Sequence, residues 1–194
     1  MMEKKKILKS FPRILLILFF VSMSFYLYVY SSPEKLISFI GVGNAYALIF
    51  VLAFLGGITT FTGIPYHLVL ITLATGGLNP LFLGISTAFG VMLGDTTSYY
   101  IGYQGSVVFP ESIQKILQRI RDFGLRYPRT LPLLFFLYGC LSPFSNDFIV
   151  ISMGLSHYPY WRVIVPLGLG NLVFNISLAY FATQAYDLLR GVVF

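Results

Sequence analysis

Charge is scarce in this 194-residue chain: 10% of its residues are Asp, Glu, Lys or Arg, and 57% are hydrophobic. A soluble domain carries about 25% charged residues, so this composition excludes an ordinary water-facing surface. No charged residue occurs between Leu36 and Gly94, a stretch far longer than the ~20 residues that one membrane crossing needs. We therefore predict an all-α, polytopic integral membrane protein.

Cysteine is nearly absent as well, because Cys140 is the only one. A single cysteine excludes an internal disulfide and a thiolate metal site, and we interpret Cys140 as a small core residue. The sequence also lacks a Ser/His/Asp set, a cluster of metal ligands and a nucleotide-binding motif. We therefore predict no enzymatic activity, no metal and no cofactor.

The net charge of +6 does not indicate nucleic-acid binding. The basic residues gather at residues 1–13 and 115–129, where they flank apolar segments as membrane topology demands. Both stretches are accordingly predicted to be cytoplasmic, in the plasma (inner) membrane of the cell. Membrane lipids with anionic headgroups are the expected partners, and a homo-oligomer is left open.

Residues 1–35 are predicted to form a basic cytoplasmic N-terminus and a first transmembrane helix. The apolar run Ile14–Tyr30 is longer than the roughly 7–15 residues of a signal-peptide core and lacks an A-x-A-like cleavage site. A retained helix is therefore preferred to a cleaved signal peptide. Residues 36–183 are predicted to form the membrane domain, and residues 184–194 a short C-terminal tail.

Within the membrane domain, short apolar segments alternate with long ones. The segments 66–74, 131–141 and 148–155 are too short to cross a hydrocarbon layer of ~30 Å. Each adjoins one of two polar, proline-containing breaks, TTFTGIP (with Gly63 and Pro65) and SPFSND (with Pro143).

We therefore predict two re-entrant helical hairpins, at 39–75 and 131–155, with these residues at the turns. Such backbone is tolerated only where protein or a water-filled cavity surrounds it. Each hairpin is followed by a transmembrane helix, at 81–101 and 161–182. Reading 39–55 and 66–74 as two complete crossings gives the same topology, so the charge pattern leaves that alternative open.

The two hairpins resemble each other. HLVLITLATGGLNP, beginning at His67, and DFIVISMGLSHYP, beginning at Asp147, both run from a polar head through an apolar arm to a proline before a long helix. If the copies face opposite ways they form an inverted repeat, which secondary transporters commonly use to place a binding site near mid-membrane.

Asp147 is the first candidate site residue. A charged side chain at the bilayer centre costs roughly 2.5–3.5 kcal/mol on insertion scales. The functional interpretation is a site that handles a proton or a lipid headgroup in a water-accessible cavity. The structural alternative is a helix cap that accepts backbone N–H bonds.

His67 occupies the corresponding place in the first hairpin, so a His–Asp pair across the two turns is expected to share a proton near neutral pH. The alternative is an ordinary core histidine. Asp95 follows Gly90 and Gly94, a G-x-x-x-G pattern that permits close helix contact. Asp95 either faces the hairpins as a second ionisable group or lies at the interface, bonded to Thr96 or Tyr99.

Residues 111–126 are predicted to form an amphipathic helix. Ile113, Ile116, Leu117, Ile120 and Phe123 share one face at helical spacing. The helix is expected to lie at the inner membrane surface, where its Lys and Arg side chains meet anionic headgroups. A solvated connector is the alternative.

Three segments together resemble the DedA family, also described as SNARE-associated or VTT-domain membrane proteins. They are TGIPYHLVLITLATGGLNP (62–80), GISTAFGVMLGDTTSYYIGYQG (84–105) and LSPFSNDFIVISMGL (141–155), and the resemblance covers about residues 57–175. It implies paired re-entrant hairpins and lipid translocation, as a flippase of polyprenyl-phosphate or phospholipid or as a scramblase, with proton coupling proposed for some members.

Carried over by position, the resemblance implies that Asn146 and Asp147 match the N-D of the second hairpin and that Asp95 matches the G-D segment. The chain also departs from the family. His67 replaces the acidic residue of many members, and Cys140 and Asn146 stand where many bacterial members have arginines. Arg129, at the hairpin entrance, is the candidate substitute for those arginines.

The expected function is therefore lipid translocation between leaflets. Two alternatives are a proton-coupled transporter of a small ion or solute, which needs a titrating Asp147 or His67, and a non-transporting membrane scaffold, in which both residues can be neutralised without loss of function.

Overall fold

The computed structural model describes residues 33–58, 66–105, 111–142 and 145–193, and these form helices and short connections without a β-strand. The helices are α2 (Pro33–Ile40), α3 (Val42–Gly56), α5 (Tyr66–Thr75), α6 (Pro80–Tyr103), α7 (Glu111–Arg126), α8 (Thr130–Leu141), α9 (Asp147–Leu155) and α10 (Trp161–Val193). The predicted all-α class is confirmed for this part of the chain. The predicted first transmembrane helix and the turn residues Gly63, Pro65 and Pro143 lie outside the described residues.

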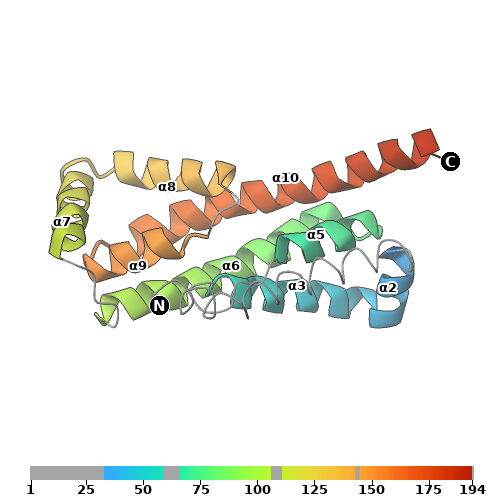
Figure 1. The fold of residues 1–194 in the computed structure, drawn as a ribbon, viewed down its shortest axis with the longest axis horizontal. Coiled ribbons are helices and arrows are strands. Elements are labelled where there is room, and N and C mark those ends of the chain that lie inside the picture. The colour runs from blue at the N-terminus through green and yellow to red at the C-terminus, as the bar shows by residue number, and fades with distance from the viewer. Residues whose placement is uncertain (1–32, 59–65, 106–110, 143–144, 194) are drawn as a thin grey trace, which may run out of the picture.

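Two long helices, α6 and α10, run antiparallel along each other and form the centre of the molecule (Figure 1). The α3–α5 pair lies toward the C-terminal end of α10, and the α8–α9 pair lies toward its N-terminal end. In each pair the second helix runs back toward the end at which the first began, so the two pairs point in opposite directions.

The chain has two halves, α2–α6 and α7–α10, and helices of one half pack on helices of the other. Helix α3 packs along α6, and α8 packs along α10, within the same half of the sequence. The second helix of each pair contacts mainly the long helix of the other half: α9 packs on α6, and α5 packs chiefly on α10. Neither half can therefore complete its core without the other.

Close backbone contacts hold α3 against α6. A Cβ added to Gly94 would lie 2.7 Å from both the Cα of Gly57 and the carbonyl oxygen of Phe54, and one added to Gly57 would lie 2.9 Å from the Val91 carbonyl oxygen. No side chain larger than hydrogen fits at these distances. The predicted close approach at the G-x-x-x-G pattern is confirmed, and its partner is α3.

The same set of contacts recurs between α8 and α10. A Cβ on Gly139 would lie 2.7 Å from the Leu167 carbonyl oxygen and 3.1 Å from the Cα of Gly170, and one on Gly170 would collide with the Phe136 carbonyl oxygen. In both halves a phenylalanine precedes the first glycine by three residues. The two halves thus share one packing pattern in opposite orientation.

The starts of the long helices follow from their local sequence. Asn79 caps α6: its Oδ1 accepts hydrogen bonds from the backbone N–H groups of Leu81 (2.9 Å) and Phe82 (3.4 Å), and Pro80 occupies the first helical position. Helix α10 begins two residues after Pro159 and continues for 33 residues, through most of the segment predicted as a tail.

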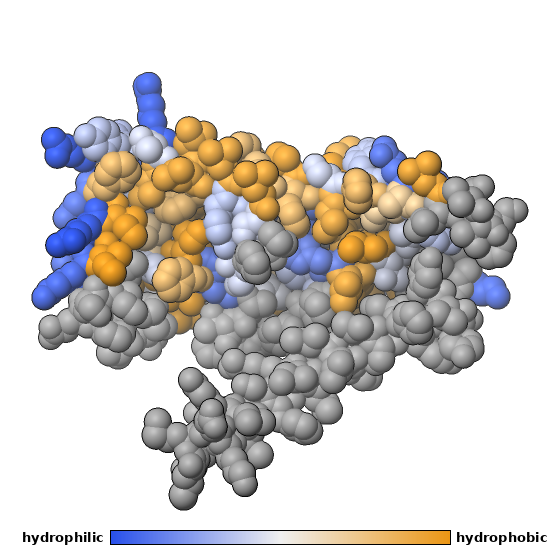
Figure 2. Space-filling model, turned by 45° about the horizontal axis from the view of Figure 1, so that its top comes forward, coloured by the Kyte–Doolittle hydropathy of each residue, from blue (hydrophilic) through white to orange (hydrophobic). Residues whose placement is uncertain are grey.

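Large apolar side chains cover much of the outer surface. Exposed examples are Phe89, Leu133, Leu141, Leu169, Val173 and Phe181, on α6, α8 and α10. Figure 2 shows hydrophobic residues over much of the length of the molecule and hydrophilic residues gathered mainly at its two ends. This distribution is the reverse of that expected for a water-facing surface.

One helix of the described chain is long and apolar enough to cross a membrane by length and composition, over Trp161–Leu188 of α10. Helices α3, α5 and α8 are apolar but shorter. Helix α6 has 24 residues, but it carries Asp95 and several hydroxyl side chains and does not meet both criteria.

Helix α7 spans Glu111–Arg126, the range predicted for the amphipathic helix. Its apolar residues Ile116, Ile120 and Phe123 are exposed, as are Lys115 and Arg119. The helix therefore presents both apolar and basic groups on the outside of the molecule.

Candidate functional site: a buried polar cluster between α6 and α9

The cluster is centred on Asp95, which is 2% exposed on α6. The amide Nδ2 of Asn146, itself 6% exposed, donates a hydrogen bond of 2.8 Å to Asp95 Oδ2. Asn146 directly precedes α9, so this bond ties the start of the second hairpin's return helix to the middle of α6. The alternative partners for Asp95 are excluded, since the Thr96 hydroxyl bonds Met92 and Tyr160 and the Tyr99 hydroxyl bonds Tyr158.

Asp147 extends the cluster. Its carboxylate is 6% exposed and accepts hydrogen bonds of 2.8 Å from the hydroxyls of Ser98 on α6 and Ser145. Ser98 also lies 3.4 Å from the carbonyl oxygen of Gly57, at the end of α3. The Ser98 bond ties Asp147 to α6, a contact beyond a helix cap, and the functional role of Asp147 stays a prediction.

The two carboxylates are buried close together and interact electrostatically. Within the described residues no cationic side chain forms an ion pair with Asp95, whose recorded partner is the neutral amide of Asn146. Burial of a charge is costly unless it is paired. The arrangement is therefore suited to take up a proton, a small cation or a polar group that supplies hydrogen-bond donors.

Direct helix contact fixes this geometry. Gly102 of α6 faces the Ile151 carbonyl oxygen of α9, and Gly154 of α9 faces the Tyr99 carbonyl oxygen of α6, each too close to admit a Cβ. The Tyr99 hydroxyl donates a 2.6 Å hydrogen bond to the Tyr158 carbonyl oxygen beyond α9. Both ends of α9 are thus anchored to α6.

His67 is not part of this cluster, and the expected His67–Asp147 pair does not form in the described structure. The imidazole packs against the rings of Tyr66 (centroids 4.0 Å apart) and Phe174 of α10 (5.6 Å). The adjacent Tyr66 instead lies within electrostatic range of Asp95 and Asp147. His67 thus packs between the adjacent Tyr66 ring and α10, and no hydrogen bond joins either residue to the carboxylates in the described structure.

Arg129 is also separate from the cluster. It is exposed and directly precedes α8, whereas Asn146 follows the opposite end of that 12-residue helix, which is about 18 Å long. Cys140 is a free, half-buried cysteine near the end of α8, and its backbone nitrogen lies close to Gly170.

Sequence reasoning missed Ser98, Tyr66, Asn171 and Asn175. The last two are buried on α10, at 6% and 1% exposure. These two could have been found in the sequence, because two asparagines one helical turn apart interrupt the apolar run GLGNLVFNIS. Ser98 offered no such signal, because serine is common in apolar helices and its role depends on which residue of α9 it meets.

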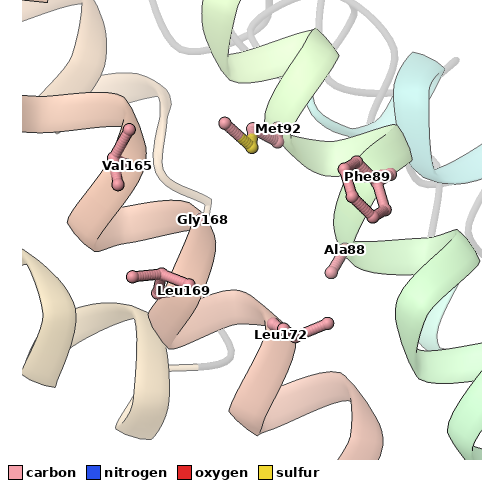
Figure 3. Close-up of a pocket in the computed structure, with 7 residues that line it drawn as sticks. All are labelled: Ala88, Phe89, Met92, Val165, Gly168, Leu169 and Leu172. Atoms are coloured by element: carbon pink, nitrogen blue, oxygen red, sulfur yellow. The ribbon is translucent and has the colours of Figure 1, made fainter. Parts of the chain in front are cut away.

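A groove of about 230 Å³ lies between α6 and α10 (Figure 3). It is entirely apolar and is lined by Ala88, Phe89, Met92, Val165, Gly168, Leu169 and Leu172. Phe89 and Leu169 are more than half exposed, so the groove opens on the outer surface. Met92 is about one helical turn from Asp95, so the groove and the polar cluster occupy neighbouring turns of α6.

The described residues contain no group of three or more His, Cys, Asp or Glu side chains that could hold a metal ion. Compared with known proteins, the chain matches no family model, no curated protein and no solved structure.

Proposed function

We propose that this protein is an integral membrane lipid translocase of the flippase or scramblase type, which moves phospholipid or polyprenyl-phosphate lipid between leaflets. The single observation that carries the proposal is the buried cluster of Asp95, Asn146, Asp147 and Ser98 inside a molecule whose outer surface is largely apolar. Ionisable groups at membrane depth are costly and are generally retained for transport.

In this proposal the paired helices are re-entrant. Helices α5, α8 and α9 have 10, 12 and 9 residues, or about 13–18 Å each, and are too short to cross a hydrocarbon layer of ~30 Å. Each pair enters and returns on one side, the two pairs from opposite sides, and the N-terminus is cytoplasmic in the plasma (inner) membrane. The polar residues at the start of α9 then lie within the membrane, supported by α6.

The apolar groove supports a lipid as the substrate. A translocated lipid needs a polar route for its headgroup and an apolar environment for its tails. The polar cluster and the groove between α6 and α10 supply these two environments in neighbouring turns of α6. The resemblance to DedA proteins agrees with this division.

The proposal is tested with purified protein in liposomes that contain a fluorescent phosphatidylglycerol or a labelled polyprenyl phosphate. We expect the protein to move one of these lipids between leaflets and Asp147→Asn to slow it about tenfold or more. Asp122→Asn, a charge change at an exposed position of α7, is the matched control and should leave the rate unchanged. Movement no faster than in protein-free liposomes with both lipids would refute the proposal.

The proximity of Asp95 and Asp147 favours one second candidate, a proton-coupled transporter of a small ion or solute. A pair of buried carboxylates can bind and release a proton as a solute passes. Solute uptake that follows an imposed pH gradient, without lipid movement, would select this function over lipid translocation.

A further inference from the structure

Two asparagines of α10 leave polar atoms buried without partners. Asn175 Nδ2 donates a 2.8 Å hydrogen bond to the backbone carbonyl oxygen of Asn171. Asn171 Nδ2 and Asn175 Oδ1, in contrast, have no hydrogen-bond partner in the described structure. A polar group that is buried without a partner loses its hydrogen bonds to water and gains none in return, which destabilises the fold. The protein tolerates this cost twice, one helical turn apart, on its longest helix.

The position of Asn171 in the repeat is informative. Asn171 follows Gly170 as Asp95 follows Gly94, and both glycines make the equivalent close contact with the neighbouring helix. Asp95 is satisfied by Asn146 from the other half of the molecule. Asn171 has no corresponding amide, because the equivalent helix α5 begins with Tyr66 and His67, and His67 contacts Phe174 through its ring.

The unpartnered atoms define the chemistry of a ligand. Asn171 Nδ2 needs an acceptor and Asn175 Oδ1 needs a donor, and a hydroxyl group supplies both. The same stretch of α10 carries Gly168, Leu169 and Leu172, which line the apolar groove. Asn171 and Asn175 belong to the same turns of α10 but do not line the groove, so a lipid hydroxyl would have to reach them past its edge.

We propose that Asn171 and Asn175 form a binding site for the hydroxyl group of a lipid headgroup, such as the glycerol of phosphatidylglycerol, whose tail occupies the groove between α6 and α10. The site would be the α10 counterpart of the Asp95–Asn146 cluster. This inference rests on the proposed function, and it names a headgroup class for it. A water molecule offers the same hydrogen bonds and is the competing occupant.

The test is the thermal unfolding of the full-length protein in detergent, titrated with short-chain phosphatidylglycerol or short-chain phosphatidylmethanol. Both lipids carry one negative charge, but only phosphatidylglycerol has hydroxyl groups. At about ten times the dissociation constant, we expect phosphatidylglycerol to raise the unfolding temperature by about 3–5 °C more than phosphatidylmethanol does. The difference should vanish in the double variant Asn171→Leu/Asn175→Leu.

If the double variant does not accumulate, Asn171→Ala serves instead, because it retains the bond from Asn175 to the backbone. Equal stabilisation by the two lipids, or a difference that persists in the variant, would overturn the proposal and assign the pair to a bound water. Since the readout is unfolding rather than lipid movement, a failure of the translocase proposal in liposomes would be recognised separately.

Discussion

The two halves of the molecule share their packing but not their chemistry. Each half has a pair of contacting glycines, Gly57 with Gly94 and Gly139 with Gly170. In both pairs each glycine also lies against the carbonyl oxygen three residues before its partner. The residue after the second glycine, however, is Asp95 in one half and Asn171 in the other. The two halves therefore share their glycine-mediated backbone contacts but differ in the polar residue that follows.

The polar difference extends to the helices that cross between the halves. Asn146 precedes α9 and Asp147 begins it, and both are hydrogen-bonded to α6. Helix α5 begins with Tyr66 and His67, and His67 makes ring contacts. The α9–α6 contact therefore includes buried carboxylates, whereas the α5–α10 contact combines apolar and aromatic packing with one hydrogen bond of 3.4 Å from the Thr183 hydroxyl to the Ala74 carbonyl oxygen.

The shared packing is tested by Gly94→Ala and Gly170→Ala. Each added methyl group meets backbone atoms that cannot move aside, so we expect each variant to lose about 1–3 kcal/mol or more of unfolding free energy. Thermal unfolding in detergent measures the loss. Gly43→Ala, where no atom lies within 4 Å of the new methyl group, is the control and should change stability little. A loss in only one half would break the packing equivalence.

The polar bond between the halves is tested by Asn146→Leu. The change leaves the Asp95 carboxylate buried without its amide donor, so we expect a loss of about 1–3 kcal/mol. Asn44→Leu, at an exposed asparagine of α3, is the matched control and should cost less. The double variant Asp95→Leu/Asn146→Leu should recover most of the stability, because neither partner is then left unpaired. An additive loss in the double variant would count against the bond.

The chemical difference is tested by Asp95→Asn, which gives the first half the residue of the second. We expect the fold to be retained and lipid movement in liposomes to slow about tenfold, equivalent to about 1.4 kcal/mol. Adding Asn171→Asp should not restore the rate, because no amide equivalent to Asn146 stands beside Asn171. A restored rate would show that positions 95 and 171 are interchangeable and would contradict the proposed difference between the halves.

The smallest effect is expected for His67→Phe. Because the imidazole contacts two aromatic rings, a phenyl ring should replace it with a stability change within about 0.5 kcal/mol and a transport rate within about twofold. A large fall in the rate, with stability unchanged, would instead give His67 a role equal to that of Asp147.

The starts of the long helices could be predicted because they depend on local signals. A proline precedes or begins each of α6 and α10, Asn79 caps α6, and apolar periodicity gives α7 its observed range. The end of α10 was not predicted, because the helix continues to Val193 through the segment predicted as a tail. Asp95 and Asp147 could be predicted to matter, because a carboxylate in an apolar segment is costly wherever it lies. Membrane topology, function and the role of α7 remain predictions.

The pairing of these residues could not be predicted. It depends on α9 packing on the long helix of the other half, which no local pattern encodes. The sequence also did not indicate that Tyr66, and not His67, lies within electrostatic range of the carboxylates. The repeat alone predicts His67 opposite Asp147. In the structure, His67 instead packs against the rings of Tyr66 and Phe174.

The crossed packing has a consequence for biogenesis. Asp95 and its amide partner Asn146 are separated by 51 positions along the chain, so the ribosome delivers the carboxylate well before the group that satisfies it. In the proposed membrane insertion, the nascent first half must keep Asp95 hydrated or shielded until α9 is made. Helix α6 can therefore reach its final packing only after the second hairpin is synthesised. A chain truncated before α9 should be unstable and degraded.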